Sequence, residues 1–217
     1  MGNGPCKRRK VVPLLPAGDA KELLRKICLS DFTTPQIRTR DLATKFEIQA
    51  SAVDLQNWAA RQFLKPLRRG RQRENLFTLR DAIKAFAISH LTPANPLPLA
   101  DEIALGIVEH AENLIAGGYD FLRAWEDNKL RVFFYEVIDA HYAKGIFISA
   151  EEAATKVACG AYGIDAHIFK AEECIFWTLC RYADWRYENP IEDLLGCDAD
   201  GFPLDPNHPC YMTSNKK

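Results

Sequence analysis

Residues 51–83 read SAVDLQNWAARQFLKPLRRGRQRENLFTLRDAI, and this stretch decides the expected fold. Ser51 is a favourable N-cap and Asp54 lies in the first helical turn, so the stretch begins with a predicted helix that ends near Arg61. The apolar positions of this helix recur at helical spacing and define its inner face. They are Leu55, Trp58 and Ala59.

A second helix is predicted just before this stretch, over Thr39–Phe46. Two short helices separated by about five residues are typical of a helix-turn-helix. After the second helix, two short apolar segments, residues 63–67 and 76–79, flank an arginine-rich turn centred on Gly70. This pattern predicts a β-hairpin.

The remaining segments are predicted to be helical. Capping residues and apolar spacing place helices over Ala20–Leu29, Thr78–Leu91, Leu99–Ala116, Phe121–Lys144, Ser149–Cys159 and Asp165–Tyr187. The expected fold is therefore mainly α, with an N-terminal winged helix-turn-helix, a small β-hairpin wing and an all-α C-terminal domain.

We expect four parts along the chain. They are a basic, disordered arm over residues 1–17, a winged-helix domain over 18–105, an acidic helical domain over 106–190 and an irregular tail over 191–217. The acidic domain would serve in dimerisation, ligand sensing or the binding of a protein partner.

The order of these features over residues 38–104 resembles the winged-helix DNA-binding domain of MerR-type regulators. Leu42-Ala43 lies in the first helix, Leu55-Gln56-Asn57-Trp58 in the second, and Arg69-Gly70-Arg71 at the wing tip. Gln56 stands where the family usually has Arg. The resemblance implies DNA binding by the same face and leaves the target sequence open, and the C-terminal half resembles no family known to us.

The second helix of a helix-turn-helix enters the major groove, so its outer face carries the candidate base contacts. Gln56 and Asn57 can each pair with an adenine edge, whereas wing arginines contact phosphates or the minor groove. The candidate DNA-binding residues are Ser51, Gln56, Asn57, Arg61, Arg68, Arg69, Arg71 and Arg73. Trp58, Phe63, Phe77 and Phe86 are interpreted as core residues.

The distribution of charge supports this hypothesis. The chain has 217 residues and a formal net charge of −1. Residues 1–92 hold 18 Lys and Arg against 8 Asp and Glu, whereas residues 93–217 hold 10 against 21. A basic half joined to an acidic half indicates nucleic-acid contact by the basic part.

Other functional classes find less support. Seven irregularly spaced cysteines, and the lack of an apolar run suited to a signal peptide or a membrane span, favour a cytoplasmic protein with reduced thiols. Cys197, Asp198, Asp200, His208 and Cys210 lie close together, but without the tight spacing of a zinc module. No enzyme motif is present, so we expect no catalytic residues, no cofactor and no metal site.

The leading hypothesis is a sequence-specific transcriptional regulator that binds double-stranded DNA as a homodimer, since two-fold DNA sites match a dimer. A DNA-packaging protein similar to small terminase subunits, or an excisionase-like accessory protein, is the first alternative. The second is a protein-interaction module that retains the fold without binding DNA.

Overall fold

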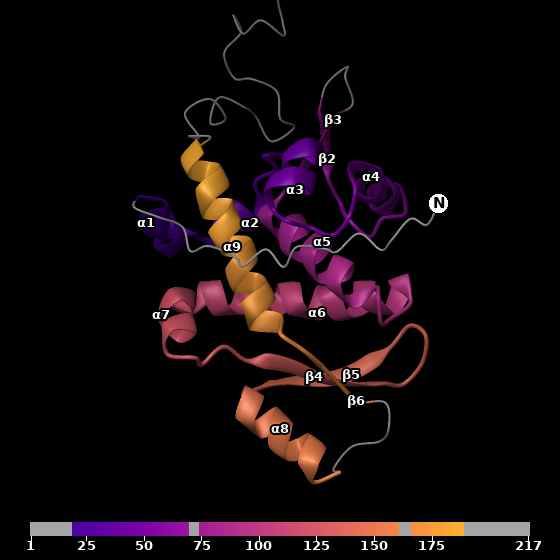
Figure 1. Cartoon of the computed structure of the whole chain (residues 1–217). Helices are drawn as coiled ribbons and strands as arrows, with labels where there is room; N and C mark the ends of the chain where they lie inside the picture. Colours follow the sequence, from indigo (N-terminus) through magenta and orange to yellow (C-terminus); the bar gives the residue numbers. More distant parts are fainter. Residues whose placement is uncertain (1–18, 70–73, 161–165, 189–217) are drawn as a thin grey trace, which may run out of the picture.

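The computed structural model describes residues 19–69, 74–160 and 166–188. Within these ranges the chain forms nine helices and six short strands, so the protein is mainly helical with two small antiparallel sheets. The proposed arm over residues 1–17 and the tail over 191–217 lie outside the described part. In Figure 1 the elements form successive tiers, from the β2–β3 hairpin at the top to helix α8 at the bottom.

The N-terminal part comprises α1 (Asp19–Lys26), α2 (Leu29–Thr33), β1 (Ile37–Arg38), α3 (Thr39–Lys45), α4 (Ala52–Ala60), β2 (Leu67–Arg69), β3 (Glu74–Phe77) and α5 (Leu79–Leu91). Its three strands form an antiparallel sheet with β3 in the centre, where Ile37 lies opposite Phe77 and Leu67 opposite Leu76. The two helices predicted for this region are thus confirmed, and the predicted hairpin is present with its strands over residues 67–69 and 74–77 instead of 63–67 and 76–79. The short strand β1 had no counterpart in the prediction.

The C-terminal part comprises α6 (Leu97–Ala116), α7 (Phe121–Glu126), β4 (Val132–Val137), β5 (Ala143–Ile148), α8 (Ala150–Ala158), β6 (Ala166–Phe169) and α9 (Ala171–Glu188). Strand β4 is the centre of the second antiparallel sheet, with β5 on one side and β6 on the other. Figure 1 shows this sheet beneath α6, and α8 on the opposite side of the sheet.

The expectation of an all-α C-terminal domain is wrong. The helix predicted over 121–144 is the short helix α7 followed by strand β4 and the start of β5, and β6 precedes α9. Residues 132–135 are all apolar and are covered on both faces. Phe134 packs under α8, whereas Phe133 and Tyr135 belong to the main core on the α6 side. A short apolar run of this kind fits both the helical and the strand period.

One apolar core extends through most of the molecule, from Leu24 in α1 to Trp185 in α9. The predicted domain boundary between residues 105 and 106 falls within α6. Ala104 and Ile107, on either side of that boundary, are both fully buried in the same core. A smaller cluster lies between the second sheet and α8.

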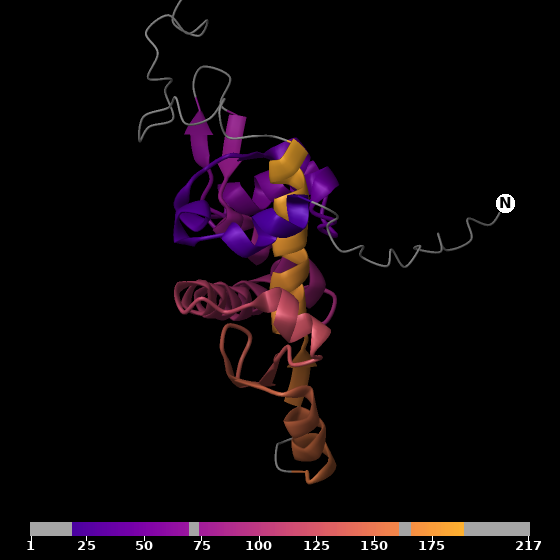
Figure 2. The same ribbon diagram turned by 90° about the vertical axis from the view of Figure 1, so that its left-hand side faces the viewer.

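Helix α9 joins the two ends of this core. It rises from the second sheet past α6 and reaches the part of the molecule that holds α3 (Figures 1 and 2). The buried hydroxyl of Tyr182 donates a 2.7 Å hydrogen bond to Asp31 and accepts one of 2.6 Å from the Gln36 amide. Burial and the adjacent Asp31 raise the pKa of Tyr182. Arg181 forms an ion pair of 2.7 Å with Glu47, in the turn between α3 and α4.

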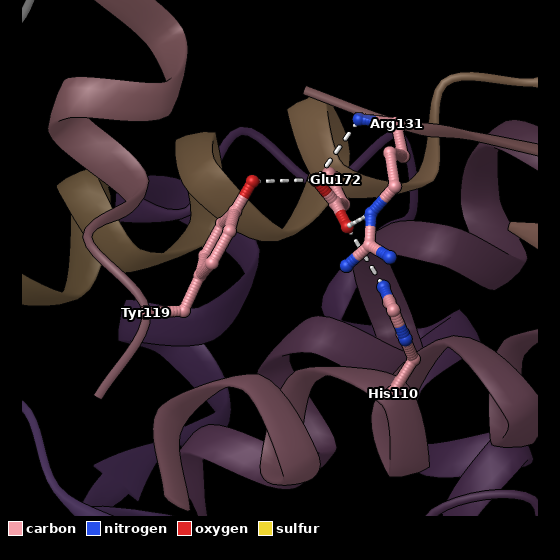
Figure 3. Close-up of polar contacts among 4 residues, drawn as sticks. All are labelled: His110, Tyr119, Arg131 and Glu172. Atoms are coloured by element: carbon pink, nitrogen blue, oxygen red, sulfur yellow. Dashed lines mark hydrogen bonds and ion pairs between the residues drawn. The ribbon is translucent and has the colours of Figure 1, made fainter. Parts of the chain in front are cut away.

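The N-terminal turn of α9 carries a fully buried carboxylate, Glu172 (Figure 3). Its Oε1 accepts bonds from Arg131 Nε at 2.7 Å and His110 Nε2 at 2.8 Å. Its Oε2 accepts from the Arg131 backbone N–H at 2.9 Å and the Tyr119 hydroxyl at 3.1 Å. His110 also stacks on Phe147 of β5, with ring centroids 3.6 Å apart. This Glu172 cluster therefore connects α9 with α6 and with the residue that precedes β4.

The contacts within the cluster shift the pKa values of Glu172 and Tyr119. Burial disfavours the ionised form of Glu172, but the hydrogen bonds from His110 and Arg131 and the Arg131 charge outweigh it and lower the pKa of the carboxyl. Burial and the charge of Glu172 raise the pKa of Tyr119 to about 12. The carboxylate is therefore the charged form that the fold stabilises.

We predict that Glu172→Gln lowers the free energy of unfolding at pH 7 by about 2–4 kcal/mol, because it removes the charge that Arg131 faces. A carboxyl whose pKa is depressed by folding stabilises the protein above its unfolded pKa, and this contribution is lost as the pH falls through the folded pKa. The stability difference between wild type and variant should therefore narrow below about pH 4.5, the ordinary value for Glu. Urea unfolding of both proteins between pH 3 and pH 8 measures this difference in the free energy of unfolding. A difference that stays constant with pH would contradict the lowered pKa of Glu172.

Candidate nucleic-acid interface

Helices α3 and α4 pack through their inner faces. Leu42 of α3, Phe46 after it and Leu55 of α4 are all fully buried in the main core. Ile48, in the turn between the helices, is 6% exposed and belongs to the same cluster. The turn bends at Glu47, which has a positive φ of 55°, a conformation that side chains other than Gly adopt infrequently. The inner face of the helix pair is thus fixed by packing.

The N-terminus of α4 is capped as the sequence indicates. The Ser51 hydroxyl oxygen accepts from the Asp54 backbone N–H at 3.1 Å, and it donates to the Asp54 carboxylate at 2.7 Å. The same carboxylate accepts from the Ser51 backbone N–H at 2.8 Å. These hydrogen bonds from Ser51 lower the pKa of Asp54. Of the predicted DNA-binding residues, Ser51 is therefore already engaged in the cap, and it acts mainly by fixing where α4 begins.

The outer face of α4 is a continuous exposed stripe. Val53, Gln56, Asn57 and Ala60 follow one another at spacings of three, one and three residues, and all four are exposed. Gln56 and Asn57 were predicted on this face. Val53, which is 62% exposed on the same face, was not among the predicted DNA-binding residues. Val53 lies three residues before Gln56 and four before Asn57, and this helical spacing would have placed it on the same face.

Arg61 is exposed immediately after α4, and its guanidinium lies 5.4 Å from the centre of the Phe63 ring. This contact orients the cation at the edge of the stripe. Trp58 and Phe63 are half-buried and pack against the main core, whereas Phe77 is fully buried. Their interpretation as core residues is confirmed, and the same holds for the half-buried Phe86.

The base of the β2–β3 hairpin is held by one carboxylate, that of Asp81 in the first turn of α5. Its Oδ2 accepts from the backbone N–H and the hydroxyl of Thr78, at 3.0 and 2.9 Å. Its Oδ1 accepts from the Lys65 backbone N–H at 3.0 Å. Asp81 is 6% exposed, and it links the segment before β2 to the helix after β3. The sequence predicted that a helix begins near Thr78 and Asp81. It did not predict the hydrogen bond from Lys65, before the hairpin, to Asp81 after it.

Two of the four predicted wing arginines fall within the described hairpin. The backbones of Arg68 and Arg69 lie in β2, opposite Asn75 and Glu74 of β3. Arg71 and Arg73 lie outside the described residues. The β2–β3 hairpin stands beside α4 at the top of Figure 1, and it lies at the same end of the molecule in Figure 2. The arginine-bearing strand and the α4 stripe thus belong to the same end of the protein.

The chain matches no protein-family model, and a search of curated proteins finds no relative of it. Within the described ranges, no group of three or more His, Cys, Asp or Glu side chains is arranged to hold a metal ion. No helix among those residues is both long and apolar enough to cross a membrane.

We predict that Asp81→Ala lowers the free energy of unfolding by about 1–3 kcal/mol. The substitution removes the carboxylate that accepts hydrogen bonds from Thr78 at the start of α5 and from the Lys65 backbone N–H. Hydrogen exchange should accelerate in β2 and β3 more than in α6, because the hairpin loses its link to α5. Exposed Asp120→Ala, which removes a cap from the short helix α7, is the matched control. Equal acceleration of the hairpin in both variants would contradict the proposed link.

Proposed function

We propose that this protein is a sequence-specific DNA-binding transcriptional regulator with a winged helix-turn-helix of MerR-like type. The observation that carries the proposal is the order β1–α3–α4–β2–β3, in which β1 pairs with β3 and closes a three-stranded sheet beside the helix pair. In a wing of this kind the hairpin is fixed to the helices by the sheet. Helix and hairpin can then contact one DNA duplex together.

In this proposal α4 enters the major groove and reads bases. Gln56 and Asn57 offer amide groups that can bind the N6 and N7 atoms of adenine, and Val53 offers a methyl surface for thymine. All three are exposed on one face of the helix. The capped N-terminus of α4 and the buried Leu55 hold this face in a fixed orientation.

The hairpin supplies affinity in this proposal. Its arginines, Arg68, Arg69, Arg71 and Arg73, fall within six residues of the sequence, and they would contact phosphates or the minor groove. Arg61 would contact the backbone beside the major groove. The net positive charge of residues 1–92 supports this side of the protein as the nucleic-acid side.

A homodimer suits this function, because two copies would bind two half-sites one helical turn apart. The C-terminal half would then provide dimerisation or the contact with another protein. A ring-shaped oligomer in solution would instead favour a DNA-packaging role, and sedimentation of the purified protein distinguishes the two.

We predict that Gln56→Ala/Asn57→Ala reduces discrimination between the preferred DNA site and its single-base variants by about 1–3 kcal/mol for each lost bidentate contact. Binding to unrelated duplexes should change little, because that binding depends on phosphate contacts. The measurement is selection of preferred duplexes from a random library, followed by titration. Exposed Asn113→Ala/Thr155→Ala, in helices α6 and α8, is the control. An unchanged sequence preference in the α4 variant would contradict base reading by α4.

We predict a different effect for Arg69→Ala/Arg71→Ala. Affinity should fall for all duplexes alike, and the slope of log affinity against log salt should become shallower by about two, one for each lost phosphate contact. Fluorescence anisotropy between 50 and 200 mM salt measures both quantities. A slope equal to that of the wild type would exclude the wing as a phosphate-binding element.

A further inference from the structure

The second sheet has an edge that no strand covers within the described part of the chain. Strand β5 pairs with β4 on one side only, with Phe134 opposite Ile146 and Tyr135 opposite Gly145. Beyond the strands, the Ile138 backbone N–H donates to the Tyr142 carbonyl at 3.0 Å. In an antiparallel pair, hydrogen-bonded and non-hydrogen-bonded residues alternate. The backbone groups of Ala143, Gly145 and Phe147 therefore point away from β4.

A groove runs between this edge and helix α6. Its cavity of about 380 Å³ is lined by Ala143 and Gly145 of β5, by Phe133 of β4 and by Glu102, Gly106 and Glu109 of α6. A Cβ atom at Gly145 would overlap the Phe133 ring, so glycine is needed where this ring crosses the strand. A Cβ atom at Gly106 would contact nothing within 4 Å, so no side chain of α6 fills the groove at this point.

The helix wall of the groove is acidic. Glu102 and Glu109 are exposed, and within the described residues neither carboxylate forms an ion pair or a hydrogen bond. Other acidic residues of α6 are paired: Asp101 with Lys84 at 2.8 Å and Glu112 with Arg80 at 3.1 Å. Glu102 and Glu109 are two helical turns apart, about 10.5 Å along the axis. Two cations in an extended chain can reach both, because residues on one face of a strand recur every 6.8 Å or so.

The opposite face of the same edge carries two exposed side chains of β5, Ile146 and, two residues before it, Lys144. Ile146 lies on the α8 side of the sheet and is 43% exposed, although its cross-strand partner Phe134 is buried. Ile168, on the far side of Phe134, is 49% exposed. A strand added beside β5 would thus meet carboxylates on the α6 side, and Ile146 with the aliphatic stem and ammonium group of Lys144 on the α8 side.

We propose that the free edge of β5 binds an extended segment of a partner protein in which basic and apolar residues alternate. The segment would add a strand to the sheet, with its basic side chains beside Glu102 and Glu109 and its apolar side chains beside Ile146. Backbone hydrogen bonds from the three outward-facing residues of β5 give affinity, and the two faces give specificity.

Charge selects a basic partner over a second copy of this chain. Helix α6 packs along β5, so two-fold pairing of β5 with itself would bring two copies of α6 together. Glu102 and Glu109 of one copy would then face the same carboxylates of the other, which is unfavourable for like charges. This inference does not depend on DNA binding, since the β5 edge and the β2–β3 hairpin lie at opposite ends of the molecule (Figure 1).

The test uses the full chain and a fluorescein-labelled peptide of four Lys-Val repeats, without DNA. The peptide should bind at least about fivefold more tightly than a block peptide of four lysines followed by four valines, because only alternation presents two different faces. Glu102→Gln/Glu109→Gln should weaken binding by about fivefold or more at low salt. Glu22→Gln/Glu151→Gln, an equal change at exposed sites away from the groove, should alter it by less than about twofold.

Two N-methylated peptides test the backbone contact. Alternate amides of a strand point to opposite sides, so methylating either all lysine or all valine amides blocks one side only. One peptide should lose binding by about tenfold or more, and the other should retain it. Equal binding of both methylated peptides, or unchanged binding by Glu102→Gln/Glu109→Gln, would overturn the proposal. A dimer of the free protein that the alternating peptide dissociates would assign the edge to a second copy and would also overturn it.

Discussion

The structure depends on helix α9, which connects parts of the chain that lie far apart in sequence. Its apolar face is buried along its length, from Cys174 to Trp185, and it contacts α1, α5 and α6. At one end Glu172 fixes the helix to α6 and to the start of β4. At the other end Tyr182 and Arg181 bind Asp31 and the turn after α3. Without α9, helices α1 and α5 and the Phe46 ring after α3 would lose a buried packing partner.

This arrangement gives the two proposed surfaces separate supports. The α4 stripe rests on buried residues and on the Ser51 cap, and the hairpin base is held by Asp81. The β5 edge instead rests on the Glu172 cluster, through the stacking of His110 on Phe147. Because the surfaces lie at opposite ends (Figures 1 and 2), DNA and a partner strand could be bound at the same time.

Local patterns in the sequence predicted the N-terminal elements, because caps such as Ser51 and Thr78 and a Gly-centred turn act within a few residues. The sheet β5-β4-β6 was not predicted. The apolar run around Phe134 fits the periodicity of a helix as well as that of a strand, and the strands that pair with it lie further along the chain. Helical spacing predicted that Gln56 and Asn57 lie on the exposed face of α4. The exposed Val53 on the same face was not predicted. The contacts of Asp81 with Lys65 and of Glu172 with Arg131 join residues that no local pattern brings together.

If the proposed function is right, α4 and the β2–β3 hairpin form one DNA-binding surface. Hydrogen exchange of the full chain, with and without a selected duplex, tests it most directly because it reports on each segment separately. We expect slower exchange in α4 and in β2 and β3 when DNA is bound, and little change in β5 and α8. Protection confined to the C-terminal sheet, or no change anywhere at low salt, would contradict it.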